Sequence, residues 1–214
     1  MHSIFREPIN ALTHLAGAVL AFIALIAMVV KASLLGSPLA IMAAILFGIS
    51  LVFLYLSSGL YHSIIASPNV IAFFRRIDHA MIYALIAGTY APLTLLALEG
   101  PTRWVLFGTV HALALFGIIF KLVWFHAPRF LSTALYIGMG WLSVFFIGPL
   151  HDVIGNAGIF WLVLGGVMYT IGGLIYGFKP KFVNWRGWGF HEVFHLFILF
   201  GSFAHFVCVF WYVF

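Results

Sequence analysis

The stretch ALTHLAGAVLAFIALIAMVV, residues 11–30, contains no Asp, Glu, Lys or Arg. About 20 apolar residues in helical conformation span the roughly 30 Å hydrocarbon core of a bilayer. The run is too long for the apolar region of a cleavable signal peptide, and it lacks a convincing cleavage site. These residues therefore predict a transmembrane helix, and similar runs recur along the chain.

The composition of the whole chain agrees with a lipid environment. Of the 214 residues, 64% are hydrophobic and 7% are charged, whereas about 25% of the residues in a soluble domain are charged. The net charge of +5 comes without a clustered basic patch, so basic loops on anionic head groups explain it better than nucleic acid does. A single cysteine, Cys208, provides no disulfide framework. We therefore expect an integral membrane protein with no nucleic-acid partner.

The apolar runs predict an all-α fold with a single domain over residues 1–214. Continuous runs without alternation favour helices over a barrel, because backbone groups in lipid must be satisfied internally. Small residues in the sixth run, Gly165, Gly166, Gly172 and Gly173, predict close helix packing. The seven expected transmembrane spans are residues 10–32, 38–62, 77–98, 104–125, 130–149, 157–178 and 189–212.

Lys and Arg are unevenly divided between the two ends of these spans. If the N-terminus is cytosolic, the outer side holds only Lys31 and Arg103. The inner side then holds Arg6, Arg75, Arg76, Lys121, Arg129, Lys179, Lys181 and Arg186. Because basic residues are enriched in cytoplasmic loops, this bias predicts a cytosolic N-terminus and a C-terminus outside.

Ionisable residues from distant parts of the chain are expected at one depth, the inner membrane boundary. His62 ends the second span, Asp78 opens the third, and His191 and His195 open the seventh. Ionisable groups within spans are costly and are therefore functional candidates.

The residue types suit zinc as a cofactor. His191 and His195 are four residues apart and share one helical face, and His62 supplies a third nitrogen. Three ligands leave a fourth position for water, as in catalytic zinc sites, and zinc lowers the pKa of that water to about 7. We expect Asp78 to accept the water's proton or hold the water, and Ser58, four residues before His62, to hydrogen-bond the site.

Each of these residues has a simpler structural interpretation. A histidine at a membrane interface is often only hydrated, and Ser58 can bond a carbonyl of its own helix. Asp78 can cap a helix N-terminus, and this role is compatible with a catalytic one.

The sequence HEVFH, residues 191–195, also matches the zinc-binding pattern of metalloproteases. The extended protease motif continues with glycine and histidine three and six residues later, but Ile198 and Gly201 stand there. His205 lies about 15 Å further along the helix, too far to bind the same ion; it is either a packed histidine or part of an interior polar pocket. Glu192 is expected at the interface as a solvated or salt-bridged acid, with a catalytic base as the alternative.

Five motifs distributed over nearly the whole chain carry a family resemblance. They are EPINALTH (7–14), SSGLYH (57–62), FRRIDHAMIYALIAGTYAP (74–92), GMGWLS (138–143) and HEVFH (191–195). In these motifs the chain resembles the hemolysin III branch of the progestin and adipoQ receptor superfamily, which is related to adiponectin receptors and alkaline-ceramidase-like membrane hydrolases.

The resemblance implies a seven-helix fold with a cytosolic N-terminus in a bacterial inner membrane. It implies zinc bound by His62, His191 and His195, with Asp78 in contact through water and Ser58 in support. Adiponectin receptors are thought to hydrolyse the lipid amide ceramide, whereas bacterial members are named for haemolytic activity and some are implicated in lipid homeostasis.

Two functions follow as hypotheses. The first is a zinc-dependent hydrolase of a lipid amide or ester, with a membrane lipid as substrate or ligand. The second is a non-enzymatic protein with structural zinc, either a lipid-homeostasis sensor or a pore-forming cytolysin.

Glu7, Asn10 and His14 share one helical face at the same membrane edge as the histidine group. They are expected to line the mouth of the site or to hold His62 in place.

Overall fold

The computed structural model describes residues 4–185 and 188–214, and this part of the chain is helical throughout, without a β-sheet. Shorter segments are the 3-10 helices η1 (Trp141–Phe146) and η2 (Lys181–Val183) and the terminal π-helical turn η3 (Val209–Val213). The main helices are α1 (Pro8–Leu34), α2 (Pro38–Ser63), α3 (Pro68–Ala97), α4 (Gly100–Val123), α5 (Arg129–Gly140), α6 (Ile147–Phe178) and α7 (Phe190–Cys208). Arg186, counted above on the inner side, lies outside the described residues.

Proline residues set the starts of the first three helices. Pro8, Pro38 and Pro68 each stand in the first helical turn, where the missing N–H costs nothing and the fixed φ suits a helix. Before α2, the Ser37 hydroxyl accepts a hydrogen bond from the Ala40 N–H at 3.3 Å, which satisfies one of the free donors at the helix end.

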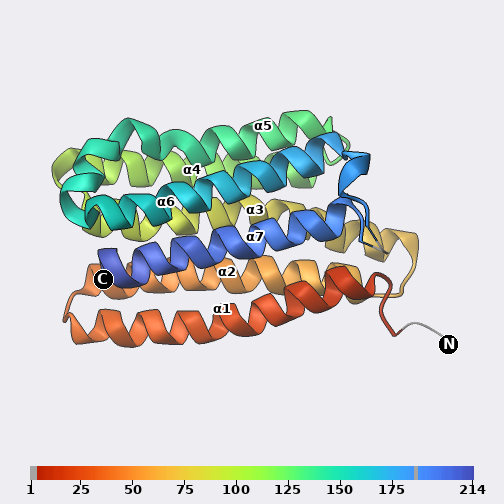
Figure 1. Ribbon diagram of the computed structural model, residues 1–214, viewed down its shortest axis with the longest axis horizontal. Helices are drawn as coiled ribbons and strands as arrows, with labels where there is room; N and C mark the ends of the chain where they lie inside the picture. The colour runs from red at the N-terminus through yellow and green to blue at the C-terminus, as the bar shows by residue number, and fades with distance from the viewer. Residues whose placement is uncertain (1–3, 186–187) are drawn as a thin grey trace.

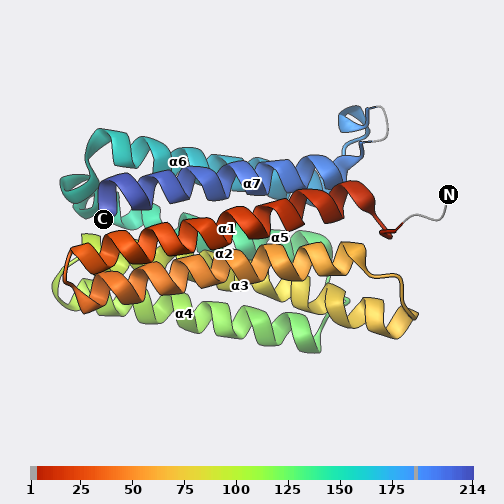
Figure 2. The same cartoon turned by 90° about the horizontal axis from the view of Figure 1, so that it is seen from below.

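The helices lie side by side along the long axis of the molecule, and the two ends of the chain are at opposite ends of the bundle (Figure 1). Helices adjacent in sequence are packed neighbours for the pairs α1–α2, α2–α3, α3–α4 and α6–α7. Figure 2 shows α6 and α7 on one side of α1 and α2, with α4 on the other side. This arrangement brings the start of α7 beside the start of α1.

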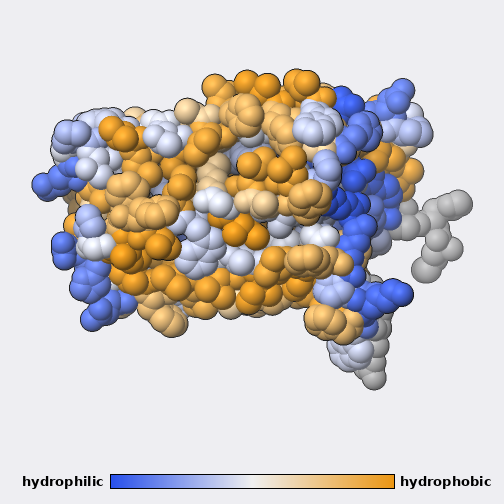
Figure 3. Space-filling model, turned by 90° about the horizontal axis from the view of Figure 1, so that it is seen from above, coloured by the Kyte–Doolittle hydropathy of each residue, from blue (hydrophilic) through white to orange (hydrophobic). Residues whose placement is uncertain are grey.

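Among the residues that the structure describes, six helices are long and apolar enough to cross a membrane, and the fifth of these is one 50-residue segment, Arg129–Phe178. This segment folds back on itself near Gly155, which has a φ of +63°, a left-handed conformation that suits glycine. A hydrogen bond joins the parts of the segment before and after Gly155: the Trp141 indole Nε1–H donates to Thr170 Oγ1 at 2.9 Å. Figure 3 shows apolar side chains over the middle of the surface and polar ones at both ends.

Helix α3 begins earlier than the expected third span. It starts at Pro68 rather than at residue 77, with Ser67 in the N-cap position. Asp78 therefore lies inside a helix, and its interpretation as an N-terminal cap is wrong. The physical reason is that Pro68 sets the helix start, whereas hydropathy detects only the part of the helix in contact with lipid.

Of the four glycines of α6 named above, two, Gly165 and Gly172, make the close contacts that the sequence predicts, whereas a Cβ at Gly166 would be in ordinary contact with Trp141 at 3.7 Å. A Cβ at Gly165 would lie 2.6 Å from Nε2 of His205, and one at Gly172 would lie 2.9 Å from Cβ of Phe197. Both neighbours are on α7, so these two glycines allow α6 and α7 to approach closely. Gly173 instead faces Thr133 of α5 at an ordinary contact distance of 3.5 Å.

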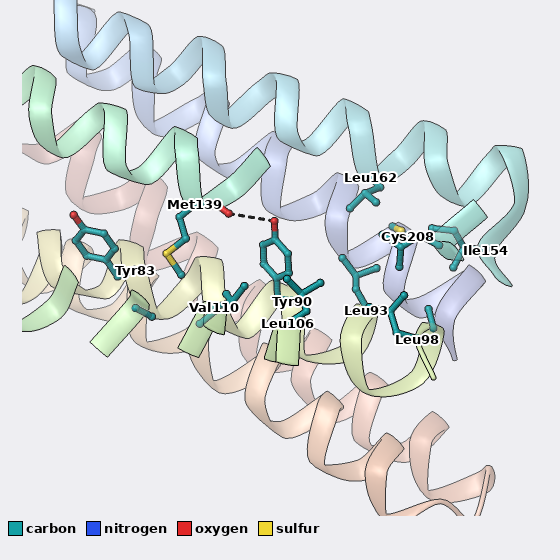
Figure 4. Packing of buried hydrophobic residues seen from close by; sticks show 14 residues of the cluster. Tyr83, Tyr90, Leu93, Leu98, Leu106, Val110, Met139, Ile154, Leu162 and Cys208 are labelled. Atoms are coloured by element: carbon teal, nitrogen blue, oxygen red, sulfur yellow. Dashed lines mark hydrogen bonds between the residues drawn. The ribbon is translucent and has the colours of Figure 1, made fainter. Parts of the chain in front are cut away.

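A hydrophobic cluster drawn from α3, α4, α5, α6 and α7 surrounds Tyr90 (Figure 4). The Tyr90 hydroxyl donates to the Gly140 carbonyl at 2.8 Å and accepts from the Ser143 N–H at 2.7 Å. It thereby bonds the backbone where α5 passes into the 3-10 helix η1. Helix α3 thus holds that transition in place.

We expect the substitution Gly88→Ala to destabilise the bundle. The new Cβ would lie 2.1 Å from Ser50 Oγ and 3.0 Å from the Leu46 carbonyl oxygen, and such overpacking costs about 1–3 kcal/mol. The thermal midpoint in detergent, followed by tryptophan fluorescence, should fall. The control is Gly108→Ala, whose Cβ would meet nothing within 4 Å; equal midpoints for the two variants would contradict the prediction.

Candidate metal centre

Three histidine side chains from two helices converge at the end of the bundle where α1 and α7 begin. His62 is in the last turn of α2, and His191 and His195 are in the first two turns of α7. One ligand nitrogen from each lies within 4.8 Å of the others. His62 and His195 are buried, each 1% exposed, and His191 is partly buried. The expected convergence of these three side chains is thus present.

The distance between two of the rings and the chemistry of all three suit a tetrahedral divalent metal. Zinc–imidazole bonds are about 2.0–2.1 Å long, which places two nitrogens on one tetrahedral ion about 3.3–3.4 Å apart. Nε2 of His62 and Nε2 of His191 are 3.3 Å apart. Neutral imidazoles are frequent ligands for such metals.

Glu7 orients the first of these rings. Its Oε2 lies 2.6 Å from Nδ1 of His62, and its Oε1 accepts from Nε of Arg6 at 3.2 Å. The hydrogen bond with His62 lowers the pKa of Glu7 to about 2, so the residue is a carboxylate at neutral pH. A carboxylate on Nδ1 places that ring's proton there and leaves Nε2 as the ligand atom.

Helix α1 braces His195 in a similar way. Thr13 Oγ1 lies 3.5 Å from Nδ1 of His195, and the backbone of Asn10 also interacts with this ring. The buried ring of His14 stacks on His195 with a centroid distance of 3.5 Å and an interplanar angle of 12°. Although α1 contributes no member of the histidine group, it fixes two of the three rings.

Asp78 and Ser58 lie next to the histidine group. Asp78 is 8% exposed and Ser58 is 1% exposed. Ser58 and His62 both interact with the Asp78 carboxylate. Asp78 is not in the set of mutually close ligand atoms, so it lies beside the histidine group rather than within it.

A cavity of about 440 Å³ begins at this group and continues into the bundle. Ser58, Asp78, His191 and His195 line one part of it, and His205 lines a deeper part. Most of the remaining lining is apolar or aromatic, from α3, α5, η1 and α6. His191, His195 and Asp78 therefore face an internal space rather than closed packing.

Sequence comparison places the chain in a known family. A sequence model described as "Haemolysin-III related" matches residues 2–206. The chain belongs to the haemolysin-III-related family. It is 42% identical to "Hemolysin-3" of Bacillus cereus over 210 residues, which covers 97% of this chain and 92% of that protein. It is 40% identical to "Hemolysin-3 homolog" of Bacillus subtilis (strain 168) over 215 residues, which covers 99% and 96%.

The acid of the HEVFH motif caps a helix in this haemolysin-III-related protein. Glu192 Oε2 accepts from the Gly189 N–H at 2.8 Å, and its Oε1 accepts from Nδ2 of Asn10 at 2.9 Å. Both carboxylate oxygens are thus engaged in holding the start of α7 against α1. Glu192 does sit in the first turn of α7, but an amide and a backbone N–H, not a basic side chain, are its partners.

Two histidines next to the centre have contacts that spacing along the sequence did not indicate. Both ring nitrogens of His14 are buried, and neither has a hydrogen-bond partner among the described residues. His79 lines the cavity, and its Nε2 lies 3.3 Å from the Tyr176 hydroxyl. The tyrosine that His79 contacts lies on α6, 97 positions away in the sequence, and no local pattern predicts this contact.

We expect Glu7→Gln to weaken metal binding by this haemolysin-III-related chain by about 10–100-fold, the usual effect of losing a carboxylate that holds a ligand histidine. Competition against a chromogenic zinc chelator measures the affinity. Glu99→Gln is the matched control, because Glu99 is exposed and precedes α4 at the other end of the bundle. Equal affinities for both variants would show that Glu7 does not set the ring of His62.

Proposed function

We propose that this chain is a zinc-dependent hydrolase that acts on an amide or ester bond of a membrane lipid. The observation that carries the proposal is the group of His62, His191 and His195 next to a buried carboxylate, Asp78, on the wall of an internal cavity. Because the three imidazoles leave a coordination position open, this donor set suits a catalytic metal.

Each residue of the site would have its own role in binding the metal or in the reaction. His62, His191 and His195 hold the ion, and Glu7 and Thr13 keep two of these rings in place. When bound, zinc supplies a Lewis acid that activates water near neutral pH and polarises a carbonyl.

Asp78 accepts a proton from the attacking water at a carboxylate oxygen and returns it to the leaving amine or alkoxide, as a general base that becomes a general acid. The Ser58 hydroxyl bonds the Asp78 carboxylate or stabilises negative charge on the substrate oxygen. The lipid's acyl chain lies in the apolar part of the cavity, which holds the amide or ester bond beside Asp78.

The proposal includes a membrane topology. We infer seven spans within one domain, a cytosolic N-terminus, an outer C-terminus and a location in the bacterial inner membrane. Two observations support this topology: the reversal near Gly155 divides the 50-residue segment Arg129–Phe178 into two legs, and most Lys and Arg residues lie at the end where α1 begins. The metal centre is then on the cytosolic side.

The test is the release of fatty acid from a membrane lipid extract by purified protein in detergent. Three preparations are compared: protein loaded with zinc, protein treated with a chelator, and chelated protein with zinc restored. We expect release in the first, none in the second and recovery in the third. Equal release from all three preparations would end the proposal.

A second function deserves a test because the centre also connects helices. The ligands come from α2 and α7, and α1 contacts two of their rings, so a metal there would tie three helices together without catalysis. Two relatives carry the name Hemolysin-3, and a cytolysin with structural zinc is the corresponding alternative. Leakage of a dye from liposomes, in the absence of any lipid product, would favour it.

A further inference from the structure

Next to the metal centre, three basic side chains line the same cavity without a carboxylate partner. They are Arg75 at the start of α3, Lys121 at the end of α4 and Arg129 at the start of α5. In the described part of the chain, none of the three forms a salt bridge. Asp78 is the only acidic residue of the described cavity wall, so the wall carries excess positive charge.

Of the three basic side chains, Lys121 is expected to have the largest free-energy cost of burial. It is 3% exposed, whereas lysines are almost never fully buried unless they are paired. Arg75 is close enough to repel it, and no hydrogen bond from its ammonium is present in the described structure. A buried cation that faces another cation is unfavourable unless an anion completes the group.

The two guanidinium groups rest on aromatic rings rather than on acids. Arg75 lies 5.0 Å from the centroid of Phe125, and Arg129 lies 5.5 Å from that of Tyr176. These contacts position the planar groups while leaving their N–H donors free for a ligand. Guanidinium groups are well suited to bind phosphate, because several N–H groups in one plane can donate to its oxygens.

Two buried hydroxyls on the same wall also have no partner. Ser132 is 3% exposed and Thr133 is 6% exposed, and both line the cavity. Neither Ser132 Oγ nor Thr133 Oγ1 has a hydrogen-bond partner in the described structure. Buried polar atoms are nearly always paired, so these hydroxyls independently indicate a ligand. Ser132 ends the first turn of α5 and Thr133 begins the second, so both are near the helix N-terminus, where the helix dipole also favours an anion.

We propose that Arg75, Lys121, Arg129, Ser132 and Thr133 form a binding site for the phosphate group of an anionic membrane lipid. The remainder of the cavity wall selects a lipid over free phosphate, because apolar side chains of α3 and α6, among them Ile86, Leu93 and Leu162, continue from this point. One end of the ligand is thus charged and the other is apolar.

This site would name the substrate class of the proposed hydrolase: a lipid that carries a phosphate in its head group and an acyl amide or ester. The statement that the bound lipid is hydrolysed rests on the proposed function. The binding itself does not, because none of the five residues belongs to the three-histidine group.

Binding can be measured by calorimetry on the full chain in detergent with three probes: dioctanoyl phosphatidic acid, dioctanoylglycerol and inorganic phosphate. We expect phosphatidic acid to bind most tightly, and Lys121→Gln to weaken its binding about tenfold or more, because one member of a buried charged pair is lost. The matched control is Lys181→Gln, an exposed lysine at the same end that does not line the cavity; it should bind like the unaltered protein.

Arg129→Gln serves as a second variant, because Arg129 is only half-buried and its loss threatens folding less than that of Lys121. Equal affinity for phosphatidic acid and dioctanoylglycerol would overturn the proposal, as would unchanged binding in both cavity variants. Inorganic phosphate that binds as tightly as phosphatidic acid would assign the site to free phosphate and overturn the lipid assignment.

The same titration on a His191→Ala variant separates this inference from the proposed function. If phosphatidic acid binds to that variant in a Lys121-dependent way while no preparation releases fatty acid, the binding site stands and the hydrolase proposal fails. If fatty acid is released only from uncharged lipids, the hydrolase proposal stands and the substrate class assigned from the phosphate site is wrong.

Discussion

Protein carrying His195→Ala is expected to purify without bound zinc and to release no fatty acid above background. His195 is buried, and Thr13, Asn10 and His14 of α1 lie around its ring. Loss of a carboxylate that merely orients a ligand costs about 10–100-fold in affinity, so loss of the ligand itself should cost more than about 100-fold.

Metal content by mass spectrometry and fatty-acid release from the same preparation measure the two effects. The control is His151→Ala, because His151 is exposed in the first turns of α6 and lies outside the histidine group. Zinc in equal amounts in both variants would mean that the three rings do not hold the ion, and the hydrolase proposal would lose its foundation.

Asp78→Asn is expected to retain zinc and to lower the rate of hydrolysis by about 10²–10⁴-fold, the range for loss of a general base. Asparagine keeps the shape of the side chain and its contact with Ser58, but it cannot accept the proton. Since the carboxylate is not among the mutually close ligand atoms, metal content and thermal midpoint should stay near those of the unaltered protein.

Asp152→Asn gives the matched control, because that carboxylate is 82% exposed and lies in the first turns of α6. Turnover is measured under saturating lipid, so that the effect is assigned to the chemical step rather than to binding. If Asp78→Asn keeps both zinc and full activity, Asp78 is not the base. If no preparation is active while zinc persists, the metal is structural.

Much of the fold follows from hydropathy. The runs around residues 11–30 and 38–62 correspond closely to α1 and α2, because apolar runs of this length in lipid must form helices. The start of α3 was placed too late, since its first turns carry Arg75 and Arg76 and hydropathy does not report a helix that continues beyond the lipid. Hydropathy also does not reveal that η1 is a 3-10 helix.

At the site, the three histidines were predictable because spacing and span parity both placed them at one depth. The residues that hold these histidines in place were harder to predict from the sequence. The bond from Glu7 to His62 joins residues 55 positions apart, and only the resemblance motif and a shared helical face pointed toward it. The unpaired state of Lys121, Ser132 and Thr133 depends on which helices face one another, which no local pattern encodes.

The transition from α5 to the 3-10 helix η1, where the Tyr90 hydroxyl bonds the backbone, has a consequence for the shape of the cavity. Residues three apart eclipse one another in a 3-10 helix, so Trp141 and Val144 of η1 form a straight column, and both line the cavity together with Ile147, the first residue of α6. In an α-helix the same residues would spiral by about 60° at each step. A straight column of side chains suits a long, unbranched acyl chain that lies parallel to the bundle axis.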